Sequence, residues 1–194
     1  SHRVRHGNRP MSEVLHRVLT AIELTRISVG FGAACDICFV VVLAAGMTAP
    51  GEGSTAALAI LVLGALMVSC GLFGYGSILN DLMDIRHDRT FSPERPIPAG
   101  TVRVPQAVVG LIGLLILAIL GATILGSDSI FLTLLVAAAL MFYNAAGRFI
   151  PAVGIITIGL VFAAHMLIPD YRMPLLPAVW LIMSHVMILA VIVH

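Results

Sequence analysis

The sequence predicts an all-α protein, a multi-pass bundle of transmembrane helices. Hydrophobic residues make up 59% of the 194 residues and charged residues only 11%, whereas a soluble domain carries about 25% charged residues. The mean hydropathy is +1.05, and apolar runs long enough to cross a hydrocarbon core of about 30 Å recur along the chain. We therefore expect an integral membrane protein.

About six spanning helices are expected, and each is followed by a short break rich in Gly, Pro or charged residues. Such breaks are typical of tight connections between antiparallel helices. The expected spans lie near residues 25–47, 56–79, 104–126, 129–147, 149–168 and 174–194. We treat residues 1–194 as one transmembrane domain, with a polar loop over residues 80–103.

The arginines predict the orientation of this bundle. All eleven basic residues are Arg; the N-terminal segment and the 80–103 loop hold nine of them, whereas the connections on the opposite side hold only Arg172. Because cytoplasmic loops are enriched in basic residues, we expect the N-terminus and the 80–103 loop to face the cytoplasm, with a bacterial inner membrane as the location. This spread forms no basic patch, so no nucleic-acid partner is expected. The chain begins at Ser1 and stops after an apolar run, which suggests a fragment.

The most informative polar residues lie at the start of the 80–103 loop: Asn80, Asp81, Asp84 and Asp88. If residues 80–88 form one helix, the three carboxylates share an arc of about 60°. Carboxylates so close repel one another and raise each other's pKa unless a cation lies among them. Oxygen ligands favour a hard cation, and Mg²⁺ uses one or two carboxylates together with water and phosphate oxygens. We therefore expect Asp81, Asp84 and Asp88 to bind Mg²⁺.

Two patterns carry a resemblance to a known family. The pattern NDxxDxxxD over residues 80–88, with RPxPxG over residues 95–100, resembles the first aspartate-rich motif of the UbiA family of intramembrane prenyltransferases. Tyr143, followed by Arg148 at the end of the fourth span, is similar to a second segment of that family, in which the basic residue is more often Lys.

The resemblance implies a bundle of about nine spans, of which this chain supplies the first six. It implies the Mg²⁺-dependent transfer of a prenyl group from an isoprenoid diphosphate to an aromatic or other lipophilic acceptor. The family's second aspartate motif follows the sixth helix and is absent from this chain. An alternative is therefore a catalytically incomplete UbiA-like protein that binds isoprenoid lipid or a partner.

Loss of diphosphate from an allylic substrate requires neutralisation of the charge on the leaving group. In this interpretation Asp81, Asp84 and Asp88 are the catalytic metal ligands, and Asn80 orients the ligand shell. Arg95 is our first choice for binding phosphate oxygens, since a guanidinium matches them bidentately. Tyr143 and Arg148 either contact the diphosphate or serve as an interfacial anchor and a topology determinant.

Three further residues are polar groups in or beside apolar spans. Asp36 lies well inside the first span, where a carboxylate is costly unless it is paired or faces water, so it either lines a substrate cavity or bonds a neighbouring helix. Arg26 either pairs with Glu23 or reaches the acceptor or the phosphate. For His165 we expect a buried hydrogen bond.

Other membrane functions are less well supported by the sequence. An alcohol phosphatidyltransferase would need an Asp-Gly-containing motif, and the chain has no Asp-Gly pair. A transporter would be expected to show an inverted repeat or a pair of broken helices, and neither is evident. Cys35, Cys38 and Cys70 lie in apolar runs and are expected to be packing residues.

Overall fold

The computed structural model describes residues 30–47, 55–172 and 174–193, and every regular element within these ranges is helical. The first described helix is Gly30–Met47. The elements that follow are α2 (Thr55–Met83), α3 (Ile85–Phe91), α4 (Val104–Leu125), α5 (Ser127–Ala145), the 3₁₀ helix η1 (Gly147–Phe149), α6 (Pro151–Leu167) and α7 (Leu176–Val193). The predicted all-α fold class is confirmed.

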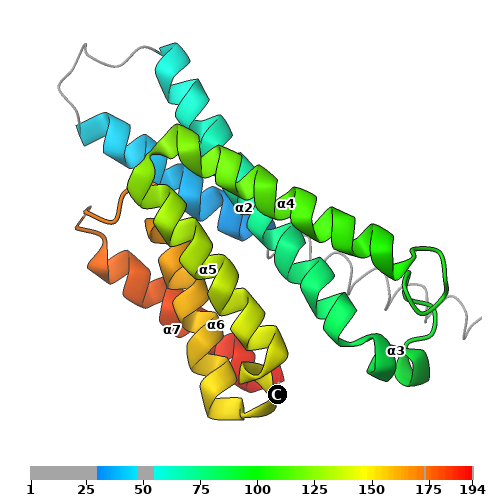
Figure 1. Cartoon of the computed structure of the whole chain (residues 1–194). Helices are drawn as coiled ribbons and strands as arrows, with labels where there is room; N and C mark the ends of the chain where they lie inside the picture. The colour runs from blue at the N-terminus through cyan, green and yellow to red at the C-terminus, as the bar shows by residue number, and fades with distance from the viewer. Residues whose placement is uncertain (1–29, 48–54, 173, 194) are drawn as a thin grey trace, which may run out of the picture.

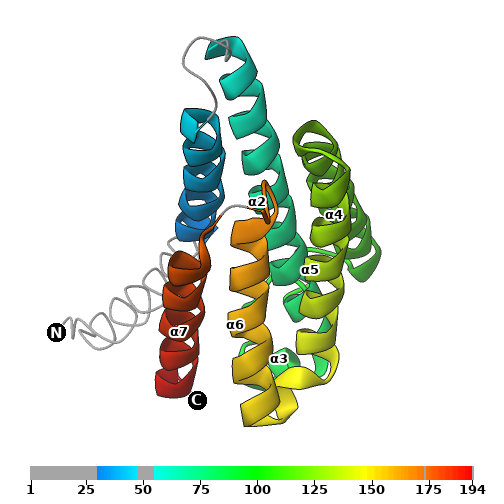
Figure 2. The same cartoon turned by 90° about the vertical axis from the view of Figure 1, so that its left-hand side faces the viewer.

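Six of these helices correspond to the six expected spans, and their described ends differ from the expected ones by at most a few residues. Residues 25–29 of the first expected span and residue 194 of the last lie outside the described residues. Four are long and apolar enough to cross a membrane, namely Gly30–Met47, α2, α4 and α5; α6 and the Leu176–Ile192 part of α7 are apolar but shorter. Figure 2 shows the helices running roughly along one direction, with α4 and α5 on one side and α7 on the other. The large exposed apolar side chains, among them Trp180 and Ile192, suit contact with lipid.

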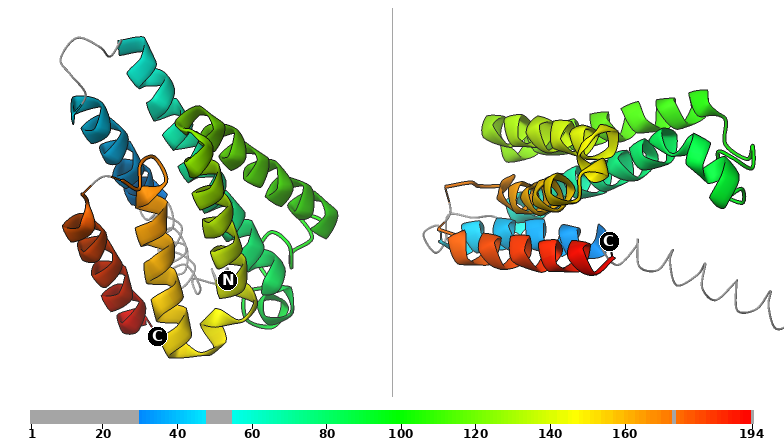
Figure 3. Two further views of the ribbon diagram at one scale, coloured as in Figure 1. Left: turned by 60° about the vertical axis from the view of Figure 1, so that its left-hand side comes forward. Right: turned by 90° about the horizontal axis from the view of Figure 1, so that it is seen from below.

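Helix α2 lies at the centre of the packing, and α4 lies along it (Figures 1 and 3). Glycines permit this close approach: a Cβ at Gly71 would lie 2.7 Å from the backbone nitrogen of Ala118, and one at Gly121 would lie 2.5 Å from the carbonyl oxygen of Gly64. Small residues are the usual means by which membrane helices bring their backbones together.

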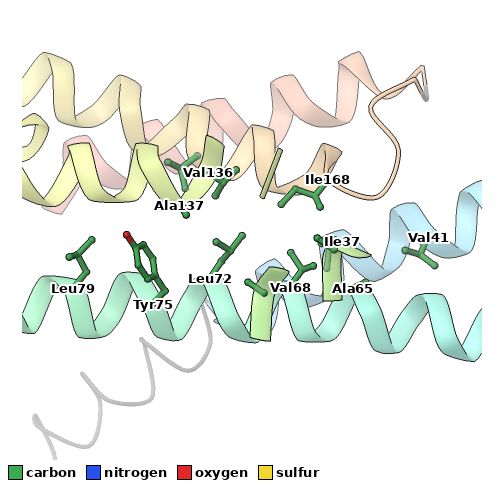
Figure 4. Close-up of a cluster of buried hydrophobic side chains, with 13 residues drawn as sticks. Ile37, Val41, Ala65, Val68, Leu72, Tyr75, Leu79, Val136, Ala137 and Ile168 are labelled. Atoms are coloured by element: carbon green, nitrogen blue, oxygen red, sulfur yellow. The ribbon is translucent and has the colours of Figure 1, made fainter. Parts of the chain in front are cut away.

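Helix α2 also packs against α5, and residues of α6 and of the Gly30–Met47 helix belong to the same buried apolar cluster. Figure 4 shows the buried apolar cluster at this junction, where Leu72 of α2 faces Val136 of α5 and Ile168, just after α6, lies near Ile37. This packing also brings the C-terminal ends of α2 and α5, which carry Asn80 and Tyr143, to the same end of the bundle.

Candidate functional site

The aspartates mark a break between two helices, not a face of one continuous helix. Helix α2 ends at Met83, Asp84 has φ −94° and ψ 3°, and α3 begins at Ile85. The prediction of a single helix over residues 80–88 is therefore wrong in detail. Backbone bonds still run from the Asp84 N–H to the Asn80 carbonyl (3.0 Å) and from the Asp88 N–H to the Asp84 carbonyl (2.8 Å), so the acidic side chains remain close to one another.

Arg95 bridges two of the three carboxylates. Its Nη1 lies 2.8 Å from Asp88 Oδ2 and 3.4 Å from Asp81 Oδ1. Asp88 is only 2% exposed, and a carboxylate at this depth is costly unless it is paired. Arg95, which we expected to bind phosphate oxygens, thus forms ion pairs with two of the aspartates in this structure.

The RPxPxG pattern builds the turn that brings Arg95 back to the acids. The Pro96 carbonyl accepts the Val102 N–H at 2.9 Å, and the Ile97 carbonyl accepts the Gly100 N–H at 3.1 Å. Gly100 has φ +76°, a left-handed conformation that costs residues with a Cβ. The two motifs are therefore parts of one structure.

Arg148, which is distant in sequence, contacts the first part of the aspartate motif. Its Nη1 donates to Asp84 Oδ2 at 2.7 Å and to Asn80 Oδ1 at 3.2 Å, and its Nη2 donates to Asp84 Oδ1. The side chain comes from η1, directly after α5, and its guanidinium lies 5.1 Å from the centre of the Phe149 ring. The bidentate contact from Arg148 lowers the pKa of Asp84 although partial burial opposes this, and the same contact raises the pKa of Arg148.

Guanidinium groups therefore occupy the place among the carboxylates where we expected a divalent cation. Asp81 and Asp88 both accept hydrogen bonds from Arg95, and Asn80 and Asp84 both accept hydrogen bonds from Arg148. Among the residues that the structure describes, no three His, Cys, Asp or Glu side chains form a group that could hold a metal. Because Mg²⁺ commonly uses only one or two carboxylates and takes its other ligands from water and phosphate, the paired oxygen donors still fit this ion.

An apolar cavity of about 340 Å³ begins beside this polar cluster. Asn80 and Tyr143 line its end nearest the aspartates, and Ser69 and His165 line the end deeper in the bundle. Between them the walls come from α2, α5 and α6. The lining residues are Ala33, Ser69, Leu72, Phe73, Gly76, Ser77, Asn80, Val136, Leu140, Tyr143, Asn144, Ile158, Val161, Phe162 and His165.

Asn144 is a cavity residue that the sequence-based site did not include. It is 4% exposed, its Nδ2 donates to the Leu140 carbonyl at 2.9 Å, and its Oδ1 has no hydrogen-bond partner. An amide at the end of an apolar helix, beside the candidate Tyr143, was the signal that could have identified it.

The remaining candidates are not brought into this cluster. Asp36 is partly buried in the Gly30–Met47 helix and does not line the cavity, although Ala33, one turn earlier, does. Arg26 lies outside the described residues. The buried hydrogen bond expected for His165 is not found among the described residues: the side chain is 7% exposed and faces the cavity without a protein partner.

Comparison with known proteins identifies the family of the chain and a solved structure with a similar fold. Residues 37–193 match the UbiA prenyltransferase family. The structure is also similar to a solved structure of a digeranylgeranylglyceryl phosphate synthase, with a TM-score of 0.62 at 20% identity over 89% of this chain. The chain spans 59% of the length of that protein, and comparison with curated proteins gave no match. The protein is a multi-pass integral membrane protein that belongs to the UbiA prenyltransferase family.

Proposed function

We propose that this chain transfers a prenyl group from an isoprenoid diphosphate to an aromatic or other lipophilic acceptor within the membrane, in a Mg²⁺-dependent reaction. The observation that carries the proposal is the double role of Asn80. It lines the apolar cavity and also accepts a hydrogen bond from Arg148 in the Asp/Arg cluster. A molecule with an apolar tail and a polyanionic head would place its tail in the apolar cavity and its head beside the arginines of the cluster.

The head would be bound by Arg95 and Arg148. Both guanidinium groups already hold oxygen anions at 2.7–2.8 Å, and phosphate oxygens present similar bidentate geometry. When a diphosphate takes the place of a carboxylate on each arginine, oxygens of Asp81, Asp84 and Asp88 that bonded to the arginines would be able to bind another cation. Tyr143, which lines the cavity together with Asn80, would donate a hydrogen bond from its hydroxyl to the same head group.

Those carboxylates, with the Asn80 amide oxygen, are the residues that would hold Mg²⁺. The bound ion would supply electrostatic neutralisation of the charge that accumulates on the leaving diphosphate. The fixed positive charges of Arg95 and Arg148 act in the same direction, because they lie where that charge develops.

The prenyl tail would occupy the apolar part of the cavity. Leu72, Phe73, Val161 and Phe162 line this part, and their side chains offer no oxygen or nitrogen to an allylic cation. Exclusion of water from such a cavity protects a reactive intermediate from hydrolysis.

The structural neighbour supports this assignment through its similar fold. That protein is described as a digeranylgeranylglyceryl phosphate synthase in membranes. The arginine distribution supports a cytoplasmic position for the Asp/Arg cluster. A bacterial inner membrane is the proposed location. Membrane lipids, an isoprenoid diphosphate and a lipophilic acceptor are the proposed partners.

Diphosphate release from a labelled prenyl diphosphate tests the proposal. The purified chain, in lipid nanodiscs with Mg²⁺ and a lipophilic phenol, is expected to release diphosphate, and Asp84→Asn is expected to reduce the rate by at least about 100-fold. Asp128→Asn is the matched control, because Asp128 is an exposed carboxylate that pairs with Arg172 outside the cluster. Equal rates for the wild type and Asp84→Asn would contradict the proposed role of Asp84.

The catalytically incomplete alternative gives a different result in the same assay. A protein that only binds isoprenoid lipid would retain the labelled diphosphate and release no product with any acceptor. One observation favours this alternative. Arg95 and Arg148 each form an ion pair with an aspartate, so the charge of each guanidinium is already neutralised before any ligand binds.

A further inference from the structure

The deeper end of the cavity carries hydrogen-bonding groups that the reaction above does not use. Ser69 is 1% exposed and its Oγ has no partner. His165, which lines the same end of the cavity, makes no side-chain hydrogen bond among the described residues. Two unpaired polar side chains at one end of an otherwise apolar cavity call for a ligand group that can bond to them.

This end lies far from the Asp/Arg cluster. Ser69 and Asn80 are both on α2 and are eleven residues apart, which corresponds to about 16 Å along the helix axis at roughly 1.5 Å per residue. A diphosphate held at the cluster cannot reach Ser69, and the hydrocarbon tail of a prenyl donor has no group that could bond there. The complementary group must therefore belong to another molecule.

The lining residues also define the charge of that group. Among the described residues, no Asp, Glu, Lys or Arg side chain lines the cavity, so an ionised group at its deeper end would find no counter-ion on them. A serine hydroxyl and an imidazole can each donate or accept a hydrogen bond. They therefore suit a hydroxyl or a carbonyl oxygen equally well.

We propose that Ser69 and His165 form a second binding subsite, which holds an uncharged hydroxyl or carbonyl group at the distal end of a lipophilic acceptor. This inference rests on the proposed prenyl transfer for its choice of the acceptor as the ligand. It assigns to the acceptor an elongated shape, with its reacting atom near Asn80, its body beside the prenyl tail in the same cavity, and a second polar group in the deeper half of the bundle.

Binding of a lipophilic alcohol, measured without Mg²⁺ or diphosphate, tests the subsite independently of turnover. The probes are farnesol and the hydrocarbon in which hydrogen replaces its hydroxyl. Ser69→Ala and His165→Phe are each expected to weaken farnesol binding by about 3- to 10-fold, the effect of one lost hydrogen bond, and to leave hydrocarbon binding unchanged. His165→Gln, which keeps a donor and an acceptor, is expected to bind farnesol better than His165→Phe.

Ser77→Ala is the matched control, because Ser77 lines the same cavity two turns closer to the aspartates. It is expected to leave farnesol binding unchanged. Thermal unfolding of each variant identifies any that fails to fold, and the single-oxygen change Ser69→Ala then decides the question. Equal losses for both probes, a loss confined to Ser77→Ala, or no loss with Ser69→Ala would overturn the subsite. Failure of prenyl transfer alone would leave these binding results intact.

Discussion

Arg148 forms an ion pair with Asp84, which lies 64 residues earlier in the sequence. A double-mutant cycle of Arg148→Ala with Asp84→Ala tests this contact. Because the pair is bidentate and both side chains are mostly buried, at 18% and 20% exposure, we expect a coupling free energy of unfolding on the order of 1 kcal/mol or more. Thermal or denaturant unfolding in a mild detergent provides the measurement.

The control cycle uses Arg172 and Asp128, whose Nη2–Oδ2 distance is 3.1 Å and whose side chains are 73% and 55% exposed. Solvent screens such a pair, so no measurable coupling is expected there. Equal coupling in the two cycles would show that the Arg148–Asp84 contact contributes no more than an ordinary surface ion pair.

The lowered pKa of Asp84 predicts a dependence of stability on pH. Its ordinary value is 3.8 and the Arg148 contact lowers it in the folded state, so the unfolded chain takes up the proton first as the pH falls. The stabilisation is fully present above the ordinary value and is lost as the pH falls through the folded value. We expect the difference in melting temperature between wild type and Asp84→Asn to shrink over that acidic range. A difference that stays constant would contradict this linkage.

At the residue scale, the sequence predicted the membership of the cluster but not its pairing. Asp81, Asp84, Asp88 and Arg95 are close in sequence, and their residue types limit the chemistry they can perform. The contact between Asp84 and Arg148 depends on how α2 and α5 pack, and no local pattern specifies that. Likewise, the sequence predicts only that His165 is a buried side chain in an apolar span. Its position at the cavity depends on how the helices pack.

At the scale of elements, the α2–α4 contact depends on glycines. A Cβ at Gly121 would lie 2.5 Å from the Gly64 carbonyl oxygen and 2.8 Å from the Val68 backbone nitrogen. Since backbone atoms cannot move aside easily, Gly121→Ala is expected to destabilise the protein by about 1–3 kcal/mol. Unfolding of the purified protein in detergent measures this effect.

Gly113, on the same helix, provides the control. A Cβ there would meet nothing within 4 Å, and Ala is a better helix former than Gly. Gly113→Ala is therefore expected to leave stability unchanged or to raise it slightly. If both substitutions had the same effect, the close approach of α2 and α4 would not be a source of stability.

Helix positions were predictable because apolar length alone marks a membrane span. The expected 104–126 span, for example, is Val104–Leu125 in the structure. The interruption at Asp84 was not predictable, because neither Pro nor Gly occurs there to mark it. The break became visible only with the backbone dihedrals of Asp84 and the separate helix α3.

For the whole molecule, the arginine distribution predicts which end of the bundle faces the cytoplasm. In a background without Cys35, Cys38 and Cys70, a cysteine in place of Thr90 is expected to react with a membrane-impermeant thiol reagent only from the cytoplasmic side. A cysteine in place of Tyr171, which is 49% exposed, is expected to react only from the opposite side. Reversed labelling would contradict the proposed orientation.

The proposed function requires one isoprenoid diphosphate to occupy the apolar cavity with its anionic head at the Asp/Arg cluster. Photo-crosslinking with a farnesyl diphosphate that carries a diazirine on its tail, with the adducts mapped by mass spectrometry, tests this requirement. We expect adducts on the cavity walls of α2, α5 and α6, removed by excess unlabelled farnesyl diphosphate and diminished in Arg148→Ala. Adducts confined to lipid-facing residues such as Leu181 and Ile192, or insensitive to the unlabelled competitor, would contradict the account.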